Sequence, residues 1–72
     1  MNGFPVLPYT VDNGIVTLTL NRPEKRNALN KGMVASLKES LARAATDPDA
    51  KVVVITGRGQ DFCAGADLEE LE

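Results

Sequence analysis

Apolar and polar residues alternate in a short stretch near the N-terminus, over residues 15–20. The apolar side chains that would share one face of a strand are Val16, Leu18 and Leu20. Asn13 and Gly14 precede this stretch, and both residue types tolerate the positive φ of a tight hairpin turn. With a first strand over residues 9–11, the pattern predicts a β-hairpin with one apolar face.

From residue 28 onward, apolar residues recur at the three- and four-residue intervals of a helix. These positions are Leu29, Met33, Val34, Leu37, Leu41 and Ala44 or Ala45. Asn30 is the predicted N-cap, because its side-chain oxygen can accept a hydrogen bond from an amide of the first turn. Pro48 restricts the residue before it, so the helix is expected to end near residue 46.

Residues 52–55 are four consecutive β-branched residues, Val-Val-Val-Ile, and strands of this kind are usually buried on both faces. One helix and one hairpin can cover only one face of a small sheet. The pattern therefore predicts that further chain, or another subunit, covers the second face. The expected fold class is α/β, made of a hairpin, a helix, a buried strand and the start of a helix, and incomplete as an independent domain. Residues 1–8 are expected to form an extended arm, and residues 9–72 to form part of one domain.

Composition narrows the classes of function. The 72 residues contain eight Lys and Arg, ten Asp and Glu, no histidine and a single cysteine, Cys63. This content excludes an intrachain disulfide and argues against a zinc site. The formal charge of -2 provides no basic field for nucleic acid, and no stretch is long and apolar enough to span a membrane. We therefore expect a cytoplasmic protein with no metal, nucleic-acid or membrane partner.

Small residues follow the apolar strand, in the segment Phe62-Cys63-Ala64-Gly65-Ala66-Asp67-Leu68. Small side chains let a ligand approach the main chain, and amides at the start of a helix suit an anion or a developing oxyanion. Without a histidine to activate it, Cys63 is interpreted as a small buried hydrophobe, and Phe62 as a core anchor. The alternative is an ordinary turn in which Gly65 and the alanines serve only packing and Asp67 caps a helix.

Two segments resemble the enoyl-CoA hydratase/isomerase family, the crotonase superfamily. They are Asn-Arg-Pro-Glu-Lys-Arg-Asn-Ala-Leu-Asn at 21–30 and Gly-Arg-Gly-Gln-Asp-Phe-Cys-Ala-Gly-Ala-Asp-Leu at 57–68. The resemblance covers the chain from Tyr9 onward. It implies a spiral of repeated ββα units, assembly as a homotrimer or hexamer, and binding of acyl-CoA thioesters. Coenzyme A would be part of the substrate, and no separate cofactor is expected.

The resemblance also implies roles for individual residues. The main-chain N–H of Ala66 would be one of two oxyanion-hole donors to the thioester carbonyl. The residues expected to bind coenzyme A and substrate are Lys25, Arg26, Ala28, Ala64, Gly65, Ala66, Asp67 and Leu68. Lys25 and Arg26 are cations suited to phosphates, although each also fits a solvated charge cluster. Asp67 is interpreted as a cap or structural group, since the family's proton transfer belongs to carboxylates further along.

The expected function is stabilisation of a thioester enolate, with hydration of a 2-enoyl-CoA as the reaction of the complete protein. The family's second oxyanion donor and catalytic glutamates have no counterpart here, so 72 residues alone are not expected to catalyse it. The alternatives are a truncated, non-catalytic chain that binds coenzyme A weakly or associates with other subunits, and a small structural domain. These residues do not determine the reaction subclass or the acyl-chain length.

Overall fold

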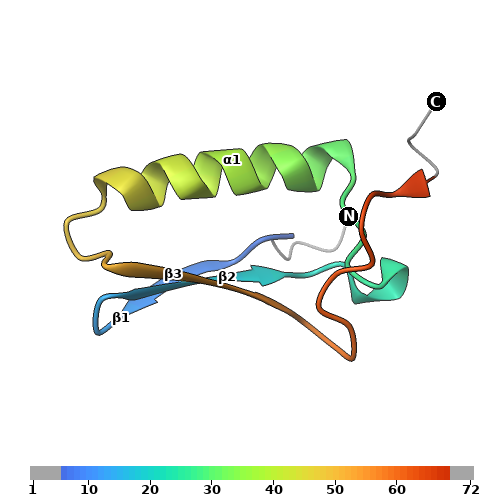
Figure 1. Cartoon of the computed structure of the whole chain (residues 1–72), viewed down its shortest axis with the longest axis horizontal. Helices are drawn as coiled ribbons and strands as arrows, with labels where there is room; N and C mark the ends of the chain where they lie inside the picture. The colour runs from blue at the N-terminus through green and yellow to red at the C-terminus, as the bar shows by residue number, and fades with distance from the viewer. Residues whose placement is uncertain (1–5, 69–72) are drawn as a thin grey trace.

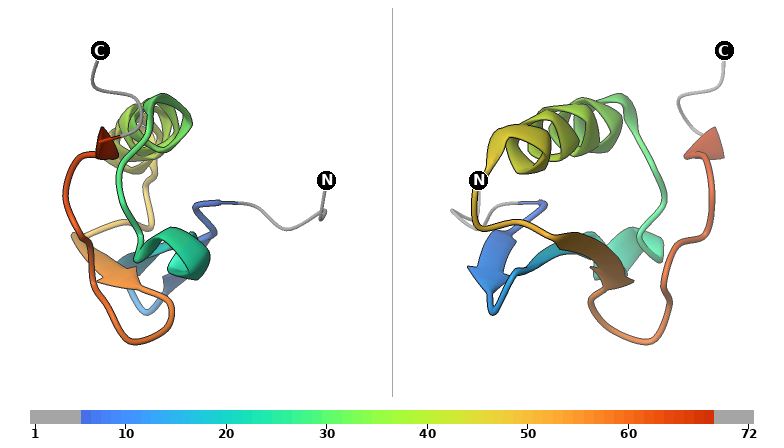
Figure 2. Two further views of the ribbon diagram at one scale, coloured as in Figure 1. Left: turned by 90° about the vertical axis from the view of Figure 1, so that its right-hand side faces the viewer. Right: turned by 60° about the vertical axis from the view of Figure 1, so that its left-hand side comes forward.

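A computed structural model describes residues 6–68 of the chain. Its three strands, β1 (Tyr9–Asp12), β2 (Ile15–Leu20) and β3 (Val52–Gly57), form one sheet in the order β1-β2-β3. A short 3-10 turn, η1 (Pro23–Lys25), follows β2, and the helix α1 (Lys31–Thr46) leads to β3. Figures 1 and 2 show α1 lying along one face of the sheet, so the predicted α/β class is confirmed. Within the described residues, no helix is long and apolar enough to cross a membrane.

The predicted hairpin is confirmed. β1 pairs antiparallel with β2, and the turn between them has φ of 51° at Asn13 and 82° at Gly14. Its apolar face is buried with residues from α1 and from the N-terminal segment. This core consists of Leu7, Val16, Leu18, Leu20, Met33 and Ala44. Residues 6–8, from the predicted arm, continue the ladder, because the carbonyls of Val6 and Pro8 accept hydrogen bonds from the chain at the end of β2.

The predicted helix is confirmed at both ends. The Asn30 side chain accepts a hydrogen bond of 2.8 Å from the Met33 N–H, as expected of an N-cap. Beyond the C-terminal end, Asp47 Oδ2 accepts a hydrogen bond of 2.9 Å from the Tyr9 hydroxyl. The Arg43 guanidinium lies 3.8 Å from the centre of the Tyr9 ring. Both contacts fasten the end of α1 to β1.

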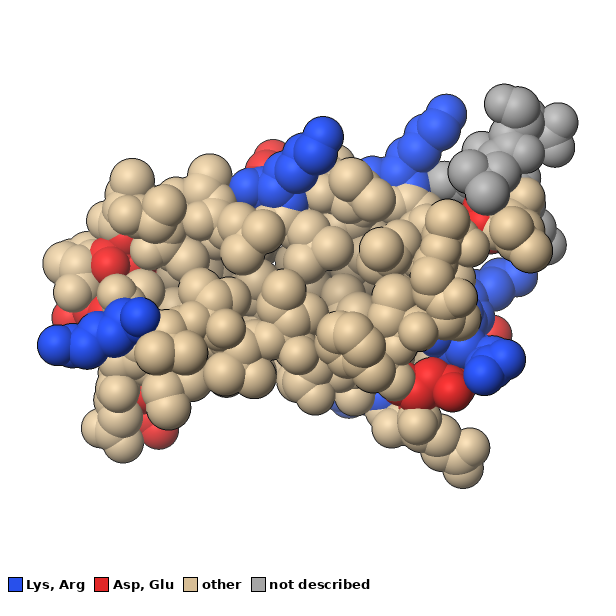
Figure 3. Space-filling model, viewed as in Figure 1, with Lys and Arg blue, Asp and Glu red and all other residues tan. Residues whose placement is uncertain are grey.

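The prediction that the helix and hairpin cover one face of residues 52–55 is wrong, whereas the prediction that this chain leaves the strand uncovered on its second face is confirmed. β3 is parallel to β2, but it is an edge strand, and α1 packs on β2. As a result, its side chains are 38% to 55% exposed at Val52, Val53, Val54 and Ile55. In Figure 3, charged side chains lie around the rim of the face shown, and its middle has none. Within the described residues, no strand pairs with the outer edge of β3.

The prediction that Phe62 anchors the core is also wrong, because its side chain is 59% exposed. The main chain of this loop approaches the sheet instead. A Cβ built at Gly57 would lie only 2.8 Å from the Phe62 Cα, so the loop can pack here only against a glycine. The second helix predicted from residue 68 falls almost wholly outside the described residues.

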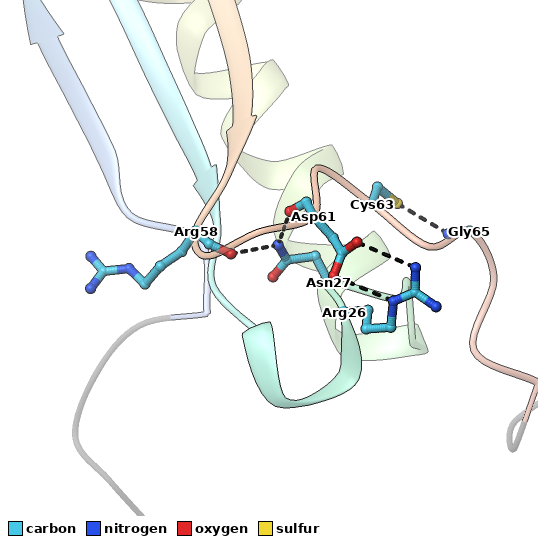
Figure 4. A network of polar contacts seen from close by, with 6 residues as sticks. All are labelled: Arg26, Asn27, Arg58, Asp61, Cys63 and Gly65. Atoms are coloured by element: carbon cyan, nitrogen blue, oxygen red, sulfur yellow. Dashed lines mark hydrogen bonds and ion pairs between the residues drawn. The ribbon is translucent and has the colours of Figure 1, made fainter.

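Asn27 connects the loop after β2 to the loop after β3. Its side chain is fully buried, and Figure 4 shows it between Arg58 and Asp61. The side-chain Nδ2 donates to the carbonyls of Arg58 (2.9 Å) and Asp61 (2.8 Å). The Oδ1 atom accepts from the Arg22 N–H at 2.8 Å. Its φ of 59° lies in the left-handed region, which asparagine tolerates better than most residues.

We expect Asn27→Ala to lower the free energy of unfolding by about 1–3 kcal/mol for each buried partner left unsatisfied. Asn27→Gly is the matched control, since it removes the same side chain but relieves the positive φ. Denaturant unfolding followed by circular dichroism measures both. A glycine variant as stable as the parent would contradict a stabilising role for the Asn27 side-chain hydrogen bonds.

The pKa of Asp47 is lowered, first by the hydrogen bond from the Asp49 N–H and then by that from the Tyr9 hydroxyl. A carboxyl whose pKa is lower in the folded state stabilises the fold above its unfolded pKa. That contribution is lost as the pH falls through the folded value. We therefore expect Asp47→Asn to reduce the fall in melting temperature that the parent shows as the pH is lowered. The melting temperature of both proteins is measured as the pH is lowered. If it falls equally in the parent and in Asp47→Asn, the hydrogen bonds to Asp47 do not stabilise the fold.

Candidate functional site

Two loops meet at one end of the sheet. β2 and β3 are parallel, so the chain leaves both strands at the same edge, where residues 21–30 and 58–68 follow. Figure 1 shows both loops beside the N-terminal end of α1. Loops after the carboxyl ends of parallel strands are the usual place for ligand sites in α/β folds.

The loops are joined by main-chain hydrogen bonds. Leu29 and Ala66 form a parallel bridge, in which the Leu29 N–H donates to the Gly65 carbonyl at 2.7 Å. The Leu29 carbonyl accepts from the Asp67 N–H at 2.9 Å. A further bond of 3.0 Å runs from the Ala64 N–H to the Arg26 carbonyl. Residues 64–67 therefore lie alongside residues 26–29 like a short added strand.

The bridge leaves the main chain of Ala66 pointing away from Leu29. In a parallel bridge, one residue makes both hydrogen bonds, and here that residue is Leu29. Within residues 6–68, no group accepts a hydrogen bond from the Ala66 N–H. The Ala66 side chain is exposed and is only a methyl group. A main-chain donor is thus held in a fixed place with little steric cover.

Ala66 and Asp67 lie where two open hollows meet, each of about 480 Å³. The first hollow is mainly apolar and runs along the start of α1. Its lining residues are Leu29, Asn30, Lys31, Val34, Ala35, Lys38, Ala66 and Asp67. The second hollow is more polar, and its lining residues are Lys25, Ala28, Ala64, Ala66, Asp67 and Leu68. Six of the eight predicted site residues therefore surround one hollow.

The two remaining predicted residues have other surroundings. Gly65, with φ of 99°, turns the chain and provides the carbonyl to Leu29. The exposed Arg26 guanidinium pairs with Asp61 at 3.3 Å, and this hydrogen-bonded pair raises the pKa of Arg26 (Figure 4). Cys63 is half-buried against the core, and its Sγ accepts a hydrogen bond of 3.4 Å from the Gly65 N–H.

Asp67 is buried and forms an ion pair with Arg22. Its Oδ2 lies 3.3 Å from Arg22 Nη2, and both side chains are nearly buried. Arg22 Nη1 also donates to the Ala28 carbonyl. No group of three potential metal ligands occurs within the described residues.

Sequence reasoning did not identify Arg22 and Asn27. Both lie in the motif at 21–30, where neither was assigned a role from the sequence. The available signal was Asn27 itself, because asparagine at a sharp loop-to-helix turn commonly adopts positive φ and hydrogen-bonds nearby main chain. Nothing in the local pattern pairs Arg22 with Asp67, which is 45 residues away.

Comparisons with known proteins identify relatives. The enoyl-CoA hydratase/isomerase family model matches residues 10–72. A probable enoyl-CoA hydratase of Mycobacterium tuberculosis is 48% identical over 67 residues, covering 93% of this chain and 26% of the relative. The 1,2-epoxyphenylacetyl-CoA isomerase of Escherichia coli is 45% identical over 60 residues, covering 83% of this chain and 23% of the relative.

Solved structures agree with this similarity. The crystal structure of an enoyl-CoA hydratase from Mycobacterium tuberculosis matches with a TM-score of 0.88 at 45% identity, covering 93% of this chain and 30% of that one. The chain spans about a quarter of the length of the curated relatives that it matches. The match over residues 10–72, the shared fold and the two loop motifs lead to one conclusion: the chain belongs to the enoyl-CoA hydratase/isomerase family.

Proposed function

We propose that this chain carries one half of an acyl-CoA thioester site, in which the Ala66 N–H donates a hydrogen bond to the thioester carbonyl oxygen. In the complete enzyme this half-site would support hydration of a 2-enoyl-CoA. The observation that carries the proposal is the Ala66 N–H itself, which no described residue accepts and which lies where the two hollows meet.

Adding water across an enoyl thioester places negative charge on the carbonyl oxygen. A donor that is already oriented stabilises this charge without reorganising during the reaction. Ala66 fits this requirement because its neighbours on both sides are hydrogen-bonded to Leu29. The donor can therefore be fixed before the substrate arrives.

The two hollows suit the two parts of a CoA thioester. Lys25 brings a cation to the polar hollow, where it could pair with phosphate oxygens of coenzyme A. The apolar hollow, with Leu29 and Val34 in its wall, offers a surface for the acyl group. A thioester carbonyl at Ala66 would lie between them.

The relatives support the coenzyme A part of the proposal more strongly than the acyl part. The two curated relatives named above carry CoA in their names, but one name specifies an enoyl group and the other an epoxyphenylacetyl group. In our proposal, the groups that move protons and the second oxyanion donor come from outside this chain. A chain that binds coenzyme A without turnover is the competing possibility, and the experiment below separates the two.

The test is a chimera in which this chain replaces the matching 67 residues of the Mycobacterium tuberculosis relative. Hydration of crotonyl-CoA is followed by loss of the enoyl absorbance. We expect Ala66→Pro, which removes the N–H, to lower kcat by about 10²- to 10³-fold, the usual effect of losing one oxyanion-hole donor. Ala66→Gly is the control, since it keeps the N–H and should retain most of the rate.

An unchanged kcat in the proline variant would contradict the donor role of Ala66. Calorimetric titration of the 72-residue chain with coenzyme A provides the second measurement. Binding by the chain, combined with an inactive but folded chimera, would favour the non-catalytic alternative.

A further inference from the structure

We propose that Arg22 is the positioning residue for the Ala66 donor. This inference rests on the function proposed above, and it assigns the task of orienting the donor to a side chain that does not line either hollow. One guanidinium holds both loops, through Asp67 on one side and the Ala28 carbonyl on the other.

The two points of contact flank the bridge between Leu29 and Ala66. Ala28 directly precedes Leu29, and Asp67 directly follows Ala66. A planar guanidinium can hold two acceptors at once in a fixed relative orientation, which a single ammonium group cannot do. Arg22 therefore limits rotation of residues 66–67 relative to residues 28–29.

Burial distinguishes this ion pair from the pair between Arg26 and Asp61. The side chains of Arg22 and Asp67 are 12% and 10% exposed, whereas those of Arg26 and Asp61 are 73% and 37% exposed at the same separation of 3.3 Å. Exposed pairs are screened by water and restrain little. Breaking a buried pair is strongly destabilising, because the remaining charge is poorly solvated, so this pair restrains the segments that it joins.

The main chain of Arg22 is itself held firmly. Its N–H donates to the buried Asn27 side chain, and its carbonyl accepts from the N–H groups of Lys25 and Asn27. Asn27 also binds the loop after β3. The guanidinium thus extends from a rigid base and can impose an orientation on Asp67.

The experiment uses the 72-residue chain and butyryl-CoA, a saturated thioester that cannot be hydrated, with its carbonyl carbon isotopically labelled. The carbonyl resonance at saturation reports polarisation by the donor, and the titration reports Kd. We expect R22Q to lose most of the downfield shift produced by the parent, while its Kd changes by less than about threefold, because Arg22 lines neither hollow. D67N, which removes the charge that Arg22 pairs with, should lose the same shift. D61N, which breaks the exposed pair, should keep both values. Circular dichroism verifies that each variant is folded.

The outcomes separate this inference from the proposed function. If the parent produces no shift, or if A66P keeps it, the proposed donor fails and this inference fails with it. If A66P loses the shift but folded R22Q and D67N keep it, only the role of Arg22 is refuted. If R22Q does not fold, R22K replaces it, because the ammonium keeps the charge but not the two-point hold, and the same loss is expected. Unfolding of R22Q, R22K and D67N alike would overturn the inference, since Arg22 would then support the whole fold.

Discussion

Leu29 makes both hydrogen bonds of a parallel bridge with the segment around Ala66, and the geometry of the candidate site follows from this contact. Without it, no main-chain hydrogen bond would hold the residues on either side of Ala66 against Leu29. With it, the chain after β3 becomes a short strand, and the unused donor of Ala66 faces away from Leu29. The proposed donor would thus be provided by main chain alone, in a segment with no obvious nucleophile or base.

The bridge can form only because the fold places both loops at the same end of the sheet. The crossover through α1 makes β3 parallel to β2, so both strands release their chains at one end of the sheet. Asn27 then joins the two loops through buried hydrogen bonds. Gly57 lets the returning main chain pass closely over the strand. Each feature acts on backbone position, which is the property that a main-chain donor requires.

Sequence patterns predicted the local elements well. Alternation over residues 15–20, the Asn13-Gly14 turn and the Asn30 cap each depend on neighbouring residues, and the structure confirms all three. The errors concern burial, which depends on contacts with elements that are distant in the sequence. The β-branched run at 52–55 indicates a preference for burial, but it cannot specify which element provides the cover, and β3 is exposed at the sheet edge. Phe62 is exposed for a similar reason, since the main chain and not the ring meets the sheet. The site residues came from motif resemblance, whereas the Arg22–Asp67 pair depends on a contact between distant segments.

The central claim, that the Ala66 N–H binds a thioester carbonyl, is tested most directly by the amide resonance of Ala66. Isotopically labelled chain would be titrated with butyryl-CoA and, separately, with free coenzyme A, which lacks the carbonyl. A new hydrogen bond to oxygen moves an amide proton downfield, so we predict a large downfield shift at Ala66 with the thioester and little change with coenzyme A. Equal shifts with both ligands, or no shift with either, would contradict the claim.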